Sequence, residues 1–153
     1  MRSVLVMGGG PAGMMAALSA ARAGARVTLL ERNEKLGKKL YITGKGRCNV
    51  TNLCQREAFL AQVPHNPRFL HGALAALSPE ALMDFFTEAG CPLQVERGNR
   101  VFPASGKASD VTRALSAQME KAGVQVRLHA RGEELLLSEG RAAGLRLATG
   151  ETL

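Results

Sequence analysis

Apolar residues in this chain follow two different spacings, and the spacing changes several times along the sequence. Short runs rich in Val and Leu have the length and composition of buried strands. Apolar residues that recur every three or four positions predict amphipathic helices. The predicted strands are 3–7, 26–30 and 124–128, and the main predicted helices are 14–23, 79–89 and 110–122. This alternation predicts an α/β fold whose parallel sheet is joined by helical crossovers.

Several helix ends carry recognisable signals. Ser78 precedes a proline and an acid, and Ser109 precedes an acid, so both serines are predicted N-caps. Gly90 and Gly123 are predicted to end the two helices that begin at these serines. Fainter patterns predict a glycine- and lysine-rich loop at 35–50, short helices at 55–63 and 68–77, extended pieces within 94–102, and a hairpin formed by 135–137 and 144–147. We expect this hairpin to begin a β-meander.

The turn after the first strand has the glycine spacing of a dinucleotide-binding fingerprint. Gly8 permits a tight turn, Gly10 lets the backbone approach a pyrophosphate, and Gly13 lets the helix pack closely on the strand. Pro11 suits the first turn of a helix, where its missing N–H is not needed. The positive N-terminal end of that helix would face the anion.

The residue after the second strand strengthens this interpretation. Glu31 lies about 20 residues beyond the glycines, where an acid binds a ribose hydroxyl. The alternative is an ordinary strand–turn–helix unit with an incidental acid. Residue chemistry leaves FAD and NAD open, but the charge of Glu31 argues against NADP at this site because it would repel a 2′-phosphate.

Composition changes this picture only slightly. The 153 residues carry a formal net charge of +7, and six lysines and arginines fall between 32 and 47. A bound diphosphate explains this basic segment, and aromatic residues for base stacking are scarce at 4%. Nucleic acid is therefore only a minor alternative as a partner. No apolar run reaches the length of a membrane span, and neither disulfide, metal nor P-loop spacing is present, so we expect a cytoplasmic protein without a membrane partner.

Four segments together resemble one flavoprotein family. They are 8–13 (Gly-Gly-Gly-Pro-Ala-Gly), 31–39 with its Glu-Arg and Gly-Lys-Lys, 43–52 (Thr-Gly-Lys-Gly-Arg-Cys-Asn-Val-Thr-Asn), and 100–111. The chain resembles the BaiN/RdsA-like (YhiN-type) NAD(P)/FAD-dependent oxidoreductases, also called aminoacetone-oxidase-family FAD-binding proteins. The segment 46–52 is the most specific of the four.

The resemblance implies FAD and assigns residues to it. By the family pattern, Gly8, Gly10, Pro11, Ala12 and Gly13 would hold the pyrophosphate. The acid Glu31 would bind the adenosine ribose, Arg32 and Lys39 would lie near the adenine or the phosphates, and the loop 44–52 would pass near the flavin with Gly46, Arg47 and Asn49. No catalytic residue and no metal ligand is assigned.

The resemblance also implies a domain organisation. We expect a Rossmann-like FAD/NAD(P)-binding domain with a central parallel sheet and a β-meander. Residues 1–49 would form the fingerprint and phosphate loop, 50–108 a helical insertion, and 109–153 a helix, a third parallel strand and the start of the meander. Because members of that family are longer, we expect a truncated domain.

Three functional hypotheses follow. The first is an FAD-dependent oxidoreductase whose electrons pass through the flavin, with NAD(P)H as a candidate reductant and a small molecule as substrate or electron acceptor. The second is a nucleotide-binding module or degenerate fragment without turnover. The third is RNA binding by the basic surface, as in some flavoproteins that modify tRNA.

Overall fold

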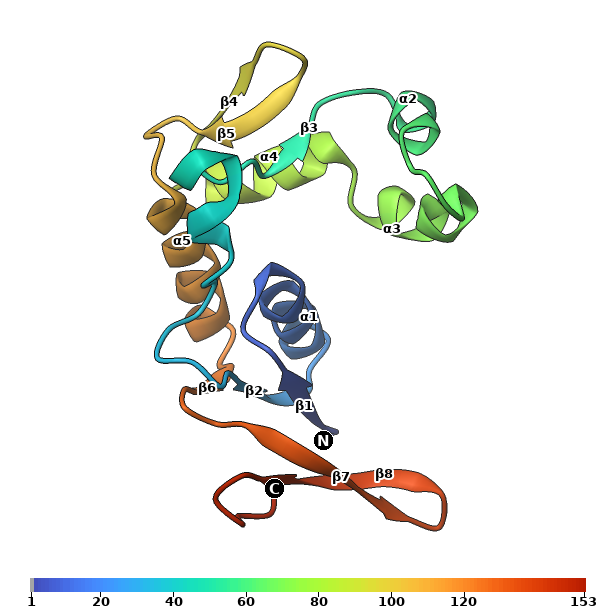
Figure 1. The fold of residues 1–153 in the computed structure, drawn as a ribbon, viewed down its shortest axis with the longest axis vertical. Helices are drawn as coiled ribbons and strands as arrows, with labels where there is room; N and C mark the ends of the chain where they lie inside the picture. The colour runs from blue at the N-terminus through green and yellow to red at the C-terminus, as the bar shows by residue number, and fades with distance from the viewer. Residues whose placement is uncertain (1) are drawn as a thin grey trace. The chain divides into compact units, whose positions relative to one another are not determined.

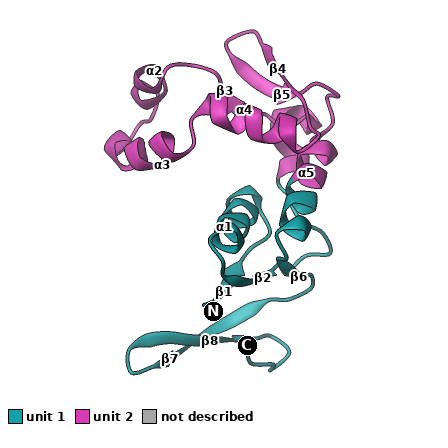
Figure 2. Ribbon diagram, turned by 180° about the vertical axis from the view of Figure 1, so that it is seen from behind, with its two compact units in different colours: residues 1–39, 115–153 teal, residues 40–114 magenta. Residues whose placement is uncertain are grey.

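A computed structural model describes residues 2–153 and divides the chain into two compact units. Unit 1 combines Met1–Lys39 with Leu115–Leu153, and unit 2 is the continuous segment Leu40–Ala114 (Figure 2). Unit 1 is therefore built from the two ends of the chain. The functional division of this chain into 1–49, 50–108 and 109–153 stays a prediction.

The sheet of unit 1 has the order β1–β2–β6, and both pairings are parallel. Its strands are β1 (Ser3–Met7), β2 (Arg26–Leu30) and β6 (Gln125–Arg127). Helix α1 (Pro11–Arg22) joins the first two strands, and helix α5 (Ala108–Lys121) leads into the third. The buried side chains of this unit come from both helices and from the strands: Met14, Ala17, Leu18, Val27, Leu29, Leu115 and Met119.

A hairpin completes unit 1 on the side of the sheet opposite α1 (Figure 1). Strands β7 (Gly132–Ser138) and β8 (Arg141–Leu147) pair in antiparallel fashion. The last residues of the chain start a third antiparallel pairing, because Leu153 exchanges backbone hydrogen bonds of 2.9 and 3.0 Å with Leu145. This geometry is the beginning of a meander. A cluster of buried residues ties the hairpin to β2: Leu30, Ala130, Leu145 and Leu147.

Unit 2 is a small antiparallel sheet with helices. The sheet order is β3 (Thr51–Asn52), β5 (Arg100–Pro103) and β4 (Leu93–Glu96). The rest of the unit consists of η1 (Leu40–Gly46), α2 (Arg56–Ala61), η2 (Pro67–Leu70), α3 (His71–Ala76) and α4 (Pro79–Glu88). Phe86 of α4 is 3% exposed, and Val101 and Phe102 of β5 are 0% and 2% exposed, so they belong to its core.

The fold class is confirmed, and several boundaries differ from the predicted ones. Helix α1 begins at Pro11, which agrees with the prediction that this proline suits the first turn, and so starts three residues before the apolar run at Met14. The predicted helix 68–77 is a 3-10 turn followed by a short α-helix, and the predicted loop 35–50 contains the turn η1. Ser78 is an N-cap as predicted, because its hydroxyl accepts a hydrogen bond of 3.2 Å from the Ala81 N–H.

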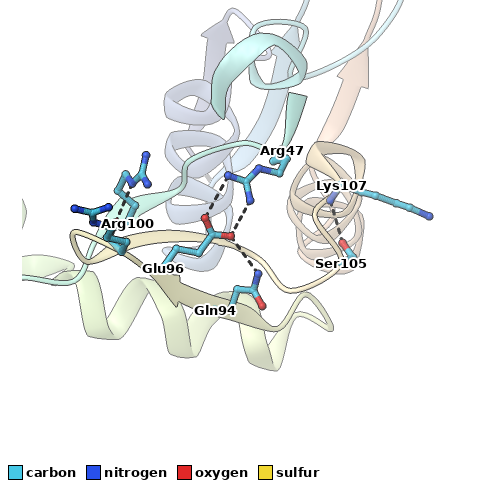
Figure 3. A network of polar contacts seen from close by, with 7 residues as sticks. Arg47, Gln94, Glu96, Arg100, Ser105 and Lys107 are labelled. Atoms are coloured by element: carbon cyan, nitrogen blue, oxygen red, sulfur yellow. Dashed lines mark hydrogen bonds and ion pairs between the residues drawn. The ribbon is translucent and has the colours of Figure 1, made fainter. Parts of the chain in front are cut away.

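The prediction for Ser109 is wrong. Helix α5 already begins at Ala108, so Ser109 lies inside its first turn. An N-cap residue has a non-helical backbone, whereas Ser109 lies within the helix and cannot be its N-cap. The turn before the helix is held instead by Ser105, whose hydroxyl accepts a 3.2 Å hydrogen bond from the Lys107 N–H (Figure 3).

Candidate functional site

A cavity of about 440 Å³ opens at the carboxyl end of the parallel sheet in unit 1. This edge is where ligands bind in open α/β sheets, and the volume lies within the usual range for ligand pockets. The segments that follow β1, β2 and β6 all contribute to its wall. They supply Gly8, Gly10 and Pro11, then Glu31, Arg32 and Asn33, and finally Ala130, Arg131 and Gly132.

Two glycines of the turn after β1 are required by the fold itself. Gly8 has a φ of +100°, a conformation that other residues rarely adopt, and its N–H donates to the Leu30 carbonyl at 2.7 Å. A Cβ atom at Gly13 would collide with the Gly8 carbonyl oxygen and lie 3.6 Å from Val6 Cγ1. The close approach of α1 to β1 therefore depends on Gly13.

Gly10 differs from both. Its φ of −77° and ψ of 176° are open to any residue, and a Cβ atom placed there would meet no heavy atom within 4 Å. The protein itself does not need a glycine at this position. Gly10 lines the cavity and is the N-cap of α1, where no side chain accepts a hydrogen bond from the first turn. The N-terminal N–H groups of the helix thus remain suited to an anion.

Glu31 is the organising residue of the cavity. Its side chain is 7% exposed, and the carboxylate accepts a 2.7 Å hydrogen bond from the Gly9 N–H. The other carboxylate oxygen accepts from the backbone N–H and the side-chain amide of Asn33, at 2.8 and 2.6 Å. Burial alone would raise the pKa of Glu31, but these hydrogen bonds outweigh it and lower the pKa below 4.5. The acid is therefore ionised at neutral pH and holds the glycine turn.

Positive charge surrounds this carboxylate. The cavity is lined by Arg32, Lys38, Lys39 and Arg131. Two of these cations form ion pairs outside the site: Lys38 lies 3.4 Å from Glu34, and Arg131 lies 3.9 Å from Glu133. All of these side chains are exposed enough to turn toward a ligand. One buried acid within a rim of cations suits a ligand that combines hydroxyl groups with phosphates.

The structure brings six of the predicted site residues together in this cavity: Gly8, Gly10, Pro11, Glu31, Arg32 and Lys39. Ala12 and Gly13 belong to the first turn of α1, directly behind Pro11. The remaining three predicted residues, Gly46, Arg47 and Asn49, belong to unit 2 and are not part of the cavity wall.

Arg47 has strong partners inside unit 2 (Figure 3). Its guanidinium donates to both carboxylate oxygens of Glu96, at 2.7 and 3.2 Å, and lies 4.2 Å from the centre of the Phe102 ring. Gln94 donates to the same carboxylate at 3.3 Å. The hydrogen bonds from Arg47 hold the pKa of Glu96 below its usual value. Arg47 therefore attaches the segment after η1 to the β4–β5 hairpin.

Gly46 and Asn49 also have structural contacts. Gly46 has a φ of +86°, and a Cβ atom there would lie 3.7 Å from the Tyr41 carbonyl oxygen. The Asn49 amide nitrogen, turned toward the carbonyl groups of Val101 and Thr51, donates to them at 3.2 and 3.1 Å. The segment 44–52 is thus shaped by hydrogen bonds within its own unit.

Sequence reasoning missed Asn33 and the wall formed by 130–132. Asn33 follows Glu31 by two residues, and in turns a side-chain oxygen commonly accepts from the backbone N–H at that spacing, as Glu31 does here. The residues 130–132 lie far along the chain from the glycines. Only the pairing of β6 with β2 brings them to the site, and the strand order would have had to be predicted first.

The fold and its cavity define a Rossmann-type dinucleotide-binding domain. Residues 2–153 match the family described as the HI0933-like protein Rossmann domain. The chain belongs to this family, which confirms the family resemblance found in the sequence.

Two curated relatives are similar to this chain in sequence. The chain is 34% identical over 142 residues to a 3-dehydro-bile acid delta(4,6)-reductase of Clostridium scindens, covering 90% of this chain and 34% of that protein. It is 33% identical over 125 residues to a ribosomal RNA dihydrouridine synthase of Escherichia coli, covering 81% and 30%. The chain thus spans about a third of the length of these curated relatives.

The fold also resembles that of Thermovibrio ammonificans THI4, with a TM-score of 0.64, 20% identity, and coverage of 95% of this chain and 47% of that one. At this identity the likeness concerns the fold alone. Within residues 2–153, no helix combines the length and apolar character needed to cross a bilayer. The same residues contain no cluster of three or more potential metal ligands.

Proposed function

We propose that this chain binds FAD and is the nucleotide-binding part of a flavin-dependent oxidoreductase. The observation that carries the proposal is Gly10: neither its backbone conformation nor its neighbours require a glycine, yet it lines the cavity at the start of α1. A glycine in that position makes physical sense when a ligand's phosphates approach the backbone. The pyrophosphate would lie against Gly8, Gly10, Pro11, Ala12 and Gly13.

The other wall residues fit the rest of an adenosine diphosphate group. Three hydrogen bonds already reach the Glu31 carboxylate, which has about four acceptor positions, so one remains for a ribose hydroxyl. Arg32 and Lys39 supply charge for the phosphates. An ionised Glu31 beside the ribose disfavours a 2′-phosphate, which supports FAD or NAD over NADP in this cavity.

The family resemblance favours FAD over NAD. When bound, the flavin accepts and donates electrons, and the protein binds and orients it. In this proposal Gly46, Arg47 and Asn49 belong to the segment that would face the flavin. Because Arg47 pairs with Glu96, its role would be to shape that segment rather than to touch a reacting atom.

The names of the relatives suggest a reaction class. One relative is named a reductase acting on a bile acid, and the other is named for a dihydro product in ribosomal RNA. We therefore propose that the complete oxidoreductase adds hydrogen across a carbon–carbon double bond, with NAD(P)H as reductant. A small-molecule substrate is the first choice, and an RNA base is the second because of the second relative's name.

The test is the visible absorption spectrum of the purified 153-residue protein, with the nucleotide released by denaturation identified by mass. We expect a flavin spectrum and recovered FAD. A folded protein that is colourless, and that binds neither added FAD nor ADP, would refute the proposal. Anaerobic addition of NADH or NADPH then separates an enzyme from a binding module, because only the enzyme's bound flavin is bleached.

A further inference from the structure

The strand order of unit 1 determines which residues meet each part of a bound dinucleotide. The pyrophosphate belongs at the end of β1, where the glycines lie, and the ribose belongs at Glu31, after β2. Strand β6 is the next strand in the sheet, on the far side of β2. The base that follows the ribose would therefore lie against the residues after β6. This reasoning rests on the function proposed above.

The segment after β6 is fixed in position next to Glu31. The His129 N–H donates to the Asn33 carbonyl at 3.1 Å, and the Ala130 N–H donates to the Glu31 carbonyl at 2.9 Å. The Arg131 carbonyl accepts from the Ala148 N–H at 2.8 Å. Backbone hydrogen bonds on both sides thus hold Arg131 in the wall of the cavity, beside the acid that would bind the ribose.

The chemistry of the wall leaves few partners for a purine. None of the described residues that line the cavity is aromatic. A purine ring is favoured by a planar partner on its face, and a guanidinium can serve because it stacks on aromatic rings. Arg32 follows β2 directly and so lies on the ribose and phosphate side, whereas Arg131 follows β6. The Arg131 side chain is 68% exposed, and its contact with Glu133 is 3.9 Å long.

We propose that Arg131 binds the base of the bound nucleotide by laying its guanidinium plane against the face of the ring. In this contact the planar shape of the Arg131 guanidinium would matter more than its charge. This role differs from that of Arg32 and Lys39, whose charge would act on the phosphates. A lysine at position 131 would keep the charge and lose the planar surface, so it cannot replace the arginine.

The experiment measures the dissociation constants of ADP and of inorganic pyrophosphate by calorimetry for the wild type, Arg131→Ala, Arg131→Lys and Arg146→Ala. Arg146 is the matched control, because it is an exposed arginine of β8 that pairs with Glu134 and does not line the cavity. We expect both Arg131 variants to bind ADP about tenfold more weakly, with pyrophosphate binding unchanged. Arg146→Ala should match the wild type for both ligands.

Each other outcome has a definite meaning. Unchanged ADP binding in both Arg131 variants would overturn the role of Arg131 while leaving the proposed function intact. Restored ADP affinity in Arg131→Lys, or an equal loss of pyrophosphate binding in Arg131→Ala, would show a phosphate contact and also overturn it. A folded wild type that binds neither ADP nor FAD would overturn the proposed function and this inference together. Thermal denaturation checks that every variant is folded.

Discussion

Gly10 and Gly72 both have open space where a Cβ atom would begin, and neither requires a left-handed backbone. The first lines the cavity and the second lies in α3. A side chain is therefore tolerated by the fold at both positions, but only one of them would meet a ligand. Substitutions at these two glycines therefore distinguish an effect on ligand binding from an effect on folding.

Gly10→Val is expected to fold normally and to lose nucleotide binding. The valine methyl groups would occupy the space that the pyrophosphate needs, so ADP affinity should fall about 100-fold or more, roughly 2.7 kcal/mol. Calorimetric titration with ADP measures the loss, and Gly72→Val serves as the control that keeps full affinity. Wild-type affinity in Gly10→Val would mean that the phosphates do not lie at this turn.

Glu31 links stability to pH. Its pKa in the folded protein is lowered below 4.5, because the ionised carboxylate accepts three hydrogen bonds. A group with a lowered pKa stabilises the fold at pH values above its unfolded pKa. That stabilisation is lost as the pH falls through the folded pKa.

Glu31→Gln should reduce the free energy of unfolding by about 1–3 kcal/mol at pH 7, because an amide nitrogen would face an N–H group that now has a carboxylate acceptor. The difference from the wild type should shrink as the pH falls from 4.5 through the lowered pKa of the folded protein, where the wild-type acid becomes protonated. Denaturation series between pH 7 and pH 3 measure this. The exposed Glu120→Gln in α5 is the control, and a difference that stays constant with pH would contradict the argument.

At the scale of elements, the turn η1 and the strand that follows it depend on the β4–β5 hairpin. Arg47 reaches Glu96 on β4 and covers the Phe102 ring of β5, while a Cβ atom at Gly44 would lie 2.7 Å from the same ring. A backbone hydrogen bond also joins the two segments, because the Val50 N–H donates to the Val101 carbonyl at 2.8 Å. The most family-specific segment of the chain is thus shaped by a hairpin about 50 residues away.

Glu96→Ala should therefore loosen the segment 43–49. Without its carboxylate partner, Arg47 no longer attaches this segment to β4, and amide hydrogen exchange there should rise roughly three- to tenfold. Exchange in unit 1 should not change. Glu88→Ala, which removes an exposed acid at the end of α4, is the matched control, and equal exchange in both variants would show that the ion pair does not hold the segment.

Elements with strong local signals were predicted well. The strands of the parallel sheet, the Ser78 cap and the hairpin around residues 139–140 all follow from patterns within a few residues. The start of α5 was not predicted, because Ser109 lies inside its first turn and the turn before the helix is held by the Ser105 hydroxyl.

At the scale of the whole molecule, the site was predicted only as far as it is local in sequence. The glycines and Glu31 belong to one strand–helix–strand unit, so their spacing revealed the cavity's first two walls. Arg131 belongs to the third wall, which exists only because β6 pairs with β2. The roles of Arg47 and Asn49 could not be foreseen either, since their partners Glu96 and Val101 come from another part of unit 2.

The division of the chain also has a consequence for the order of folding during synthesis. Strand β2 leaves the ribosome well before β6, because all of Leu40–Ala114 is made between them. Unit 2 is continuous, while the edge of the parallel sheet beside β2 stays unpaired until β6 has been translated. The wall of the cavity that follows β6 is therefore added only after all of unit 2 has been made.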